Sequence, residues 1–271
     1  MEIRQLQSWH EFRDNIDELE ETTKKEQKDS KPPLTPLLFR GQANQEWDLS
    51  TTLERYLPTS GDGTISMSEY YRTIRQLQPQ IESFTGRKFN TYEYPNYRQW
   101  LSKQTSPFIS SFYGYEYFVY LRHHGFPSPL LDWTASPYIA AYFAFWDRTI
   151  KADNVSIFAY QEMAEYGKTA SEGSAAITRL GPYIRSHQRH FKQYSDYTIC
   201  VKKVKNDVVY ISHQEVFKNN SRYQDRLWKF VIPANERRGV LQELDRYNLN
   251  AFSLFGSEES LMQTLAFREL S

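Results

Sequence analysis

An arginine followed directly by a glycine ends a short apolar stretch, and this pair is the first point in the sequence with an evident chemical use. The apolar residues 37–39 predict a buried strand, and Gly41 predicts a turn directly after Arg40. A guanidinium is always charged and presents a planar fork that fits phosphate or carboxylate. Arg40 is therefore a candidate anion clamp. A structural ion pair with Asp132 is the equal alternative.

The stretch "LLDWTAS", residues 130–136, is the second candidate. Asp132 lies in apolar surroundings, so its carboxylate must be paired or protonated, and we expect it to orient Arg40 or His124. Thr134 and Ser136 alternate, so an extended chain presents both hydroxyls on one face. Ser136 also precedes a proline and is placed to cap a helix. The stretch is either the wall of a cleft or a rigid corner of the fold.

The third candidate is a loop that leads into a strand predicted over residues 197–201. The loop carries three basic residues, Arg185, Arg189 and Lys192. Gln193 and Ser195 follow and alternate, so both side chains can face the same cleft. Basic residues in such a loop can contact phosphates locally, and otherwise they are simply solvated.

Several common chemistries are not favoured by the spacing of the residues. His187 and His190 have a metal-chelating spacing and His213 is a third candidate ligand, but no HExxH or CxxC motif accompanies them and their segment is predicted not to be helical. We therefore expect no metal. A GxSxG elbow is absent, which argues against a serine hydrolase. A phosphate-binding loop and a GxGxxG motif are absent too.

The composition gives no global preference for a charged partner. The 271 residues include 33 Lys and Arg against 33 Asp and Glu, so binding to a polyanion must be local. The single cysteine, Cys200, is expected to be a buried apolar residue. The first residues lack a signal-peptide pattern, and no apolar run reaches the roughly 20 residues that span a bilayer. These features predict a cytoplasmic protein with no membrane partner.

Helices and strands follow one another without regular alternation. Residues 8–25 predict an amphipathic helix capped by Ser8, followed by a charged linker that ends in prolines. Further helices are predicted over 67–84, 110–125, 137–147, 234–248 and 257–267, with strands over 154–161, 207–217 and 226–233. This order predicts a mixed α+β fold: a mainly antiparallel sheet with helices around it.

Four segments in this order resemble the FRG domain family of bacterial proteins. They are "LFRGQ" around Phe39-Arg40-Gly41, "HHGFPSPLLDWTASPYIAAYFA" at 123–144, "RHFKQYS" at 189–195 and "LFGSEESL" at 254–261. The resemblance extends over roughly residues 30–265. It implies one FRG domain over 31–271, with a helix and linker over 1–30 packed on it. By family association, it also implies a toxin or an anti-phage defence effector.

A weaker resemblance connects the motifs to ADP-ribosyltransferases of the arginine-serine-glutamate class. It implies that Arg40 binds the phosphates or ribose of NAD and that Thr134 and Ser136 shape the nicotinamide pocket. Tyr138 and Tyr142 are implied as stacking partners. The sequence departs from the class where its glutamate belongs, because Gln193-Tyr194-Ser195 stands there. The implied substitutes for this carboxylate are Asp196, Glu215 and Glu259.

The leading hypothesis is an ADP-ribosyltransferase-like core that binds NAD or a related nucleotide as substrate and acts on a protein or nucleic-acid acceptor, or hydrolyses NAD. Its catalytic candidates are Arg40, Ser136, Gln193 and Glu259, and its nucleotide-binding candidates are Arg40, His124, Trp133, Thr134, Ser136, Tyr142 and Arg189. The alternative is a module without catalysis that binds protein or nucleic acid through an aromatic cleft. A carboxylate close to Arg40 favours the enzyme, whereas burial of Arg40 against Asp132 with no open pocket favours a packing role.

Overall fold

A computed structural model describes residues 1–29, 35–57, 64–104, 112–162, 173–185, 188–205, 207–218 and 225–270. Its strands are β1 (Glu2–Gln5), β2 (Leu38–Gln42), β3 (Leu131–Thr134), β4 (Asn154–Gln161), β5 (Ala175–Arg179), β6 (Ser195–Val204), β7 (Asp207–Tyr210) and β8 (Arg226–Pro233). Its helices are α1 (Trp9–Asp29), α2 (Thr52–Tyr56), α3 (Met67–Thr85), α4 (Tyr94–Ser102), α5 (Tyr115–His123), α6 (Pro137–Trp146), α7 (Gln188–Lys192), α8 (Gln214–Lys218), α9 (Arg237–Arg246), α10 (Ala251–Phe255) and α11 (Glu258–Leu270). A short 3-10 helix, η1 (Ala234–Glu236), precedes α9.

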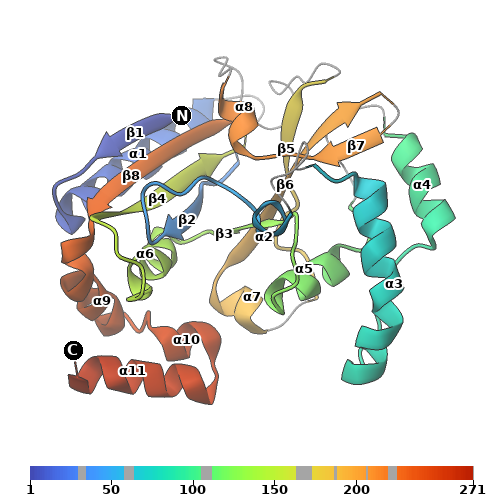
Figure 1. Ribbon diagram of the computed structural model, residues 1–271. Helices are drawn as coiled ribbons and strands as arrows, with labels where there is room; N and C mark the ends of the chain where they lie inside the picture. Colours follow the sequence, from blue (N-terminus) through green and yellow to red (C-terminus); the bar gives the residue numbers. More distant parts are fainter. Residues whose placement is uncertain are drawn as a thin grey trace.

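The described strands form one mixed sheet in the order β1-β8-β4-β2-β3-β6-β5, with β7 paired to β6 (Figure 1). Only the β1–β8 pair is parallel, and every other ladder is antiparallel. The predicted α+β fold with a mainly antiparallel sheet is thus confirmed. The sequence did not predict β1, which is short and lies at the edge of the sheet.

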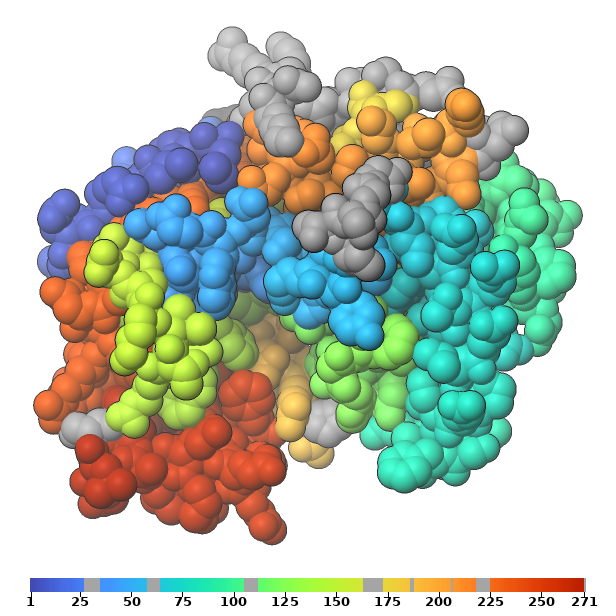
Figure 2. Space-filling view, in the orientation of Figure 1, coloured from blue at the N-terminus to red at the C-terminus, as the bar shows by residue number. Residues whose placement is uncertain are grey.

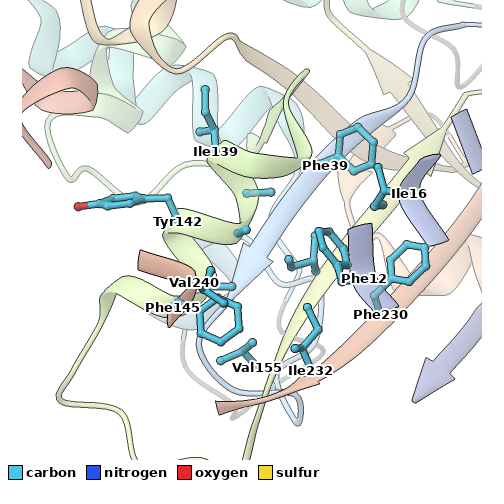
Figure 3. Packing of buried hydrophobic residues seen from close by; sticks show 14 of the residues in the cluster. Phe12, Ile16, Phe39, Ile139, Tyr142, Phe145, Val155, Phe230, Ile232 and Val240 are labelled. Atoms are coloured by element: carbon cyan, nitrogen blue, oxygen red, sulfur yellow. The ribbon is translucent and has the colours of Figure 1, made fainter. Parts of the chain in front are cut away.

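One apolar core lies where α1 and α6 cover β2, β4 and β8, and α9 and α10 extend it (Figure 3). The predicted stripe of α1 is buried here, and Ser8 caps the helix by accepting a hydrogen bond from the Glu11 N–H. Gly41 allows α6 to lie directly on β2: a Cβ at this position would sit 1.8 Å from the Ala140 carbonyl oxygen. The close contact therefore depends on the absence of a side chain.

A second core lies on the other side of the molecule, where α3, α4 and α5 pack against β6 and β7. Aromatic rings dominate it; Tyr71 and Tyr97, for example, stack with centroids 3.6 Å apart. A third cluster covers the opposite face of the central strands and includes Trp133 and Cys200. Cys200 is buried there, as predicted.

Three local predictions were wrong. Gly41 was predicted to make a turn directly after Arg40, but β2 continues through Gly41 to Gln42. The segment from residue 188, predicted to be a loop, forms the short helix α7, and the strand predicted over 207–217 ends at Tyr210 and is followed by α8. Both helices are only one turn long, so the sequence carries no amphipathic periodicity that marks them. At the C-terminal end, Ser257 accepts a hydrogen bond from the Ser260 N–H and caps α11, as predicted.

Candidate anion-binding site

The three candidate segments lie on neighbouring strands. Phe39 of β2 pairs with Thr134 of β3, and Thr134 pairs in turn with Ser195 of β6. Residues 95 and 61 positions apart in the sequence are thereby paired on neighbouring strands. The sheet topology therefore places the Arg40, "LLDWTAS" and Gln193 segments at one location.

Arg40 bridges the point where β2 and β3 separate. The ladder between these strands consists of the single pair Phe39 and Thr134, and beyond it Arg40 Nη1 donates a hydrogen bond to the main-chain carbonyl of Asp132 at 2.8 Å. Arg40 Nε is buried and has no hydrogen-bond partner among the residues that the structure describes. Burial lowers the pKa of the guanidinium to about 10, and Asp132 opposes this effect. Arg40 therefore stays charged at neutral pH, with one buried N–H donor unused.

The carboxylate of Asp132 is engaged by a residue that the sequence did not predict. Arg122 of α5 donates from Nε to Oδ1 at 3.0 Å and from Nη2 to Oδ2. The Asp132 side chain is 38% exposed and that of Arg122 is 19% exposed. Asp132 thus holds Arg122 with its side chain and Arg40 with its main chain. Arg122 lies directly before the His123-His124 pair, and no sequence motif marks it as a partner of Asp132.

Arg55 of α2 joins this group. Its Nη1 donates to the Ser50 carbonyl at 2.7 Å, and burial, followed by the nearby Arg122, lowers its pKa. The negative charges of Asp132 and Glu54 raise the pKa of Arg55 and so oppose this effect. Burial raises the pKa of Glu54, so the protein disfavours its charged form. We call Arg40, Arg55, Arg122 and Asp132 the arginine cluster.

A family comparison covers this part of the chain. The model of the FRG domain matches residues 35–153. The chain carries an FRG domain. No curated protein and no solved structure matches the chain.

The tripeptide that marks the FRG domain has a distinct physical task for each residue. Phe39 is 1% exposed and belongs to the core under α6, Arg40 belongs to the arginine cluster, and Gly41 allows the contact with α6. All members of the arginine cluster lie within the matched residues. The Gln193 segment and α11 lie outside them.

The hydroxyls of the FRG domain's "WTAS" stretch form internal hydrogen bonds. Thr134 Oγ1 donates to the Gln193 carbonyl at 2.7 Å and accepts from the Ser136 N–H at 3.1 Å. Ser136 Oγ caps α6 by accepting from the Ile139 N–H at 3.3 Å, as its sequence position predicts. The Gln193 side chain donates to the Leu254 carbonyl at 3.2 Å. This corner ties β3, α6 and α10 together.

The remaining candidates lie apart from one another. Trp133 is buried on the opposite face of β3, stacks on Tyr160 and donates from its indole N–H to Thr198 Oγ1 at 2.8 Å. Tyr142 is also buried and points away from β2 (Figure 3). Strand and helix periodicity turns both rings into the interior, so neither lines an open surface as the cleft hypothesis requires.

Three polar candidates lie at the periphery. His124 is exposed at the end of α5, with its ring 4.3 Å from that of Tyr120. Arg189 lies on α7, with its guanidinium 5.6 Å from the ring centroid of Phe255. Glu259 is exposed in the first turn of α11. No described contact joins Glu259 to Arg40.

The other carboxylates suggested as substitutes for the missing glutamate are placed differently. Asp196 is buried and forms an ion pair with Arg179, whose Nη2 lies 2.6 Å from Asp196 Oδ2. A buried carboxylate held in this way has a structural partner. Glu215 lies in the first turn of α8. Asp132 is therefore the partly exposed carboxylate that lies with the arginines.

A histidine–tyrosine pair beside the arginine cluster was not predicted from the sequence either. Tyr197 of β6 pairs across the ladder with Asp132, and its hydroxyl lies 2.5 Å from His123 Nε2. Burial and, next, Asp132 raise the pKa of Tyr197, so its hydroxyl keeps its proton. The ring of His190 stacks on the ring of Tyr197, with the two centroids 5.9 Å apart. His187, the other half of the suggested metal pair, lies outside the described residues.

Figure 2 shows a recess between α6 and the C-terminal helices on one side and α2 and α5 on the other. The segment that contains α7 and the start of β6 lies at its base. A separate depression of about 590 Å³ lies near the start of α9. In the described part of the chain, no group of three or more His, Cys, Asp or Glu side chains is placed to hold a metal ion. None of its helices combines the length and apolar character needed to cross a membrane.

Proposed function

We propose that the FRG domain binds NAD, or a related nucleotide, through its phosphates at the arginine cluster. The observation that carries this proposal is the imbalance of charge: the charges of Arg40, Arg55 and Arg122 act on one another near a single carboxylate, Asp132, whose oxygens are bonded by Arg122. Glu54, the other nearby acid, is held toward its neutral form by burial. Such a group of like charges is stabilised by a bound anion.

The donor geometry supports a phosphate ligand. Arg40 Nε is a buried N–H donor without a partner, and buried donors of this kind are rare unless a ligand or water satisfies them. Guanidinium forks bind phosphate oxygens through paired hydrogen bonds. Two phosphates in a row, as in a dinucleotide, offer enough acceptors for more than one of these arginines.

The chemistry proposed at this site is transfer of ADP-ribose or cleavage of the bond between nicotinamide and ribose. Both reactions pass through a cationic sugar, which a carboxylate stabilises. Gln193 cannot supply that charge, and its amide is bonded to Leu254. Asp132 is partly exposed, so we assign it this role in place of the usual glutamate. Because consumption of NAD harms a bacterial cell, we further propose that the protein acts as a toxin or an anti-phage defence effector.

A second candidate function is a binding module without catalysis. It is favoured by the internal hydrogen bonds of Thr134, Ser136 and Gln193, because each of these polar groups already has a structural partner. Turnover separates the two functions. Asp132→Asn tests the enzyme directly, because it removes the charge and keeps the shape of the side chain.

The experiment is NAD turnover by the purified chain, followed by mass spectrometry of nucleotides and of the protein, with and without cell lysate as a source of acceptors. The expected result is release of nicotinamide by the wild type and by Arg72→Ala, an exposed arginine on α3 that serves as the control. Arg55→Ala and Asp132→Asn should lose about tenfold or more in rate. Circular dichroism verifies that each variant is folded. A wild type that binds NAD without consuming it supports the binding module.

A further inference from the structure

The segment over residues 181–195 exposes three aromatic side chains on the surface. Tyr183 is 92% exposed, Phe191 is 65% exposed and Tyr194 is 66% exposed. Single exposed rings are common on protein surfaces, whereas a contiguous group of them marks a binding surface. Their function is not explained by the arginine cluster.

The backbone that carries these rings is held firmly. His190 Nε2 lies 3.0 Å from the Pro182 carbonyl oxygen, which brings the neighbours Tyr183 and Phe191 to the same part of the surface. Tyr115 donates its hydroxyl to the Gly181 carbonyl at 2.6 Å, and the Arg185 N–H donates to Glu116. The main chain next to Tyr183 and Phe191 is therefore anchored to the rest of the fold.

Tyr194 is held in a conformation that side chains normally avoid. Its φ is 46°, in the left-handed region. Its N–H donates to the Phe191 carbonyl at 3.1 Å, and its carbonyl accepts from the Ala135 N–H at 3.0 Å. These bonds turn the ring outward next to the "WTAS" corner. Strain of this kind persists only where the surrounding structure imposes it.

The charge of the segment complements a polyanion. Residues 181–195 contain Arg185, Arg189 and Lys192 and no Asp or Glu. Arg185 and Lys192 are exposed, and Arg189 lies over Phe255. Glu116 contacts this segment by accepting a hydrogen bond from the main-chain N–H of Arg185. The whole chain is neutral, so this local excess is a property of the segment.

We propose that Tyr183, Phe191, Tyr194, Arg185 and Lys192 form an aromatic platform that binds single-stranded nucleic acid. Exposed rings stack on unpaired bases regardless of sequence, and interleaved cations contact the phosphates. A duplex keeps its bases stacked on each other and offers these rings nothing comparable. The platform adjoins the recess, so a strand bound there lies beside the site of the proposed NAD chemistry. The binding itself does not depend on that chemistry.

The test is fluorescence anisotropy with labelled, non-self-complementary DNA and RNA strands of about 16 nucleotides and with the matching DNA duplex. The test variant is Tyr183→Ala with Phe191→Ala. The control is Phe84→Ala with Tyr247→Ala, which removes rings that are 93% and 64% exposed elsewhere. We expect the wild type and the control to bind single strands more tightly than duplex. The test variant should bind at least about tenfold more weakly.

The contribution of the basic residues to binding is measured separately, by the salt dependence of the affinity for single strands. Lys192→Glu should reduce the slope of log affinity against log salt by about one or more, whereas Arg72→Glu on α3 should not. Equal binding by the test and control variants overturns the proposal, as does equal affinity for single strands and duplex. No binding to either single strand also overturns it and makes a protein partner the remaining explanation for these rings. NAD binding, measured separately by calorimetry, reports on the proposed function alone.

Discussion

Arg122 donates hydrogen bonds from Nε and Nη2 to the carboxylate of Asp132, and Arg40 donates one to the main-chain carbonyl of the same aspartate. One residue thus organises two guanidiniums from different elements, α5 and β2. The arginine cluster is therefore assembled from separate segments of the sequence that the fold brings together.

Asp132→Asn is expected to separate binding from catalysis. Removing the negative charge leaves the guanidiniums of the arginine cluster unbalanced, so affinity for pyrophosphate should rise by several-fold while NAD turnover falls. The ion pair is partly exposed, so the free energy of unfolding should fall by only about 1 kcal/mol. Calorimetry with pyrophosphate and urea unfolding measure these changes. Unchanged turnover in Asp132→Asn would remove Asp132 from the mechanism.

Gly41→Ala is expected to disrupt the packing of α6 on β2. The new Cβ would lie 1.8 Å from the Ala140 carbonyl oxygen and 2.7 Å from the Ala144 nitrogen, and both contacts are main-chain atoms that cannot rotate away. The cost is at least about 3 kcal/mol, enough to prevent folding in many domains.

Gly239→Ala is the matched control for this substitution. A Cβ at position 239 meets nothing within 4 Å, and the residue lies inside α9. Its replacement should raise the free energy of unfolding by about 0.5–1 kcal/mol. Urea titration of both variants gives the comparison. A Gly41→Ala protein as stable as the wild type would contradict the packing described above.

Tyr194→Gly is expected to stabilise the fold even though it removes a large side chain. The left-handed backbone at Tyr194 is strained, and its ring is mostly in water, so glycine should add about 1 kcal/mol. Lys205→Gly, with φ of 55°, should do the same and serves as the control. If only Tyr194→Gly weakens binding of single-stranded nucleic acid, the ring acts on a ligand. A lower melting temperature for Tyr194→Gly would show that the ring stabilises the fold.

The C-terminal helix is expected to loosen in acid. Hydrogen bonds from Arg268 lower the pKa of Asp245, so the ionised carboxylate stabilises the fold above its unfolded pKa of about 3.9. This contribution disappears as the pH falls from there through the folded pKa. Hydrogen exchange of α11 between pH 6 and pH 3 should reveal the change, with the two values chosen to bracket about 3.9. Asp245→Asn should abolish the pH dependence, and Glu259→Gln, an exposed site on the same helix, should retain it.

The sequence predicted the features that depend on local patterns. The apolar stripe of α1, the caps Ser8, Ser136 and Ser257, and the mixed sheet follow from periodicity and short-range hydrogen bonding. The anion clamp at Arg40 was also proposed from its place after an apolar strand. Its predicted partner Asp132 does lie beside it, although the bond is to the main chain.

The partners of the site could not be predicted from the sequence because they come from distant elements. Arg122 and Arg55 lie on helices whose placement depends on aromatic packing against β6, which no local pattern encodes. Trp133 and Tyr142 were assigned to a cleft because of their neighbours in sequence. Alternation in β3 and the helical turn of α6 direct both side chains inward.

The central claim is tested most directly by isothermal titration of NAD and ADP-ribose into the wild type, Arg55→Ala and Arg72→Ala. If the arginine cluster binds the phosphates, the wild type and Arg72→Ala bind both nucleotides with similar affinity, and nicotinamide alone binds much more weakly. Arg55→Ala should then bind about tenfold more weakly, because one charge-assisted contact of about 1.4 kcal/mol is lost. Equal affinity in Arg55→Ala, or no binding by the wild type, would contradict the account.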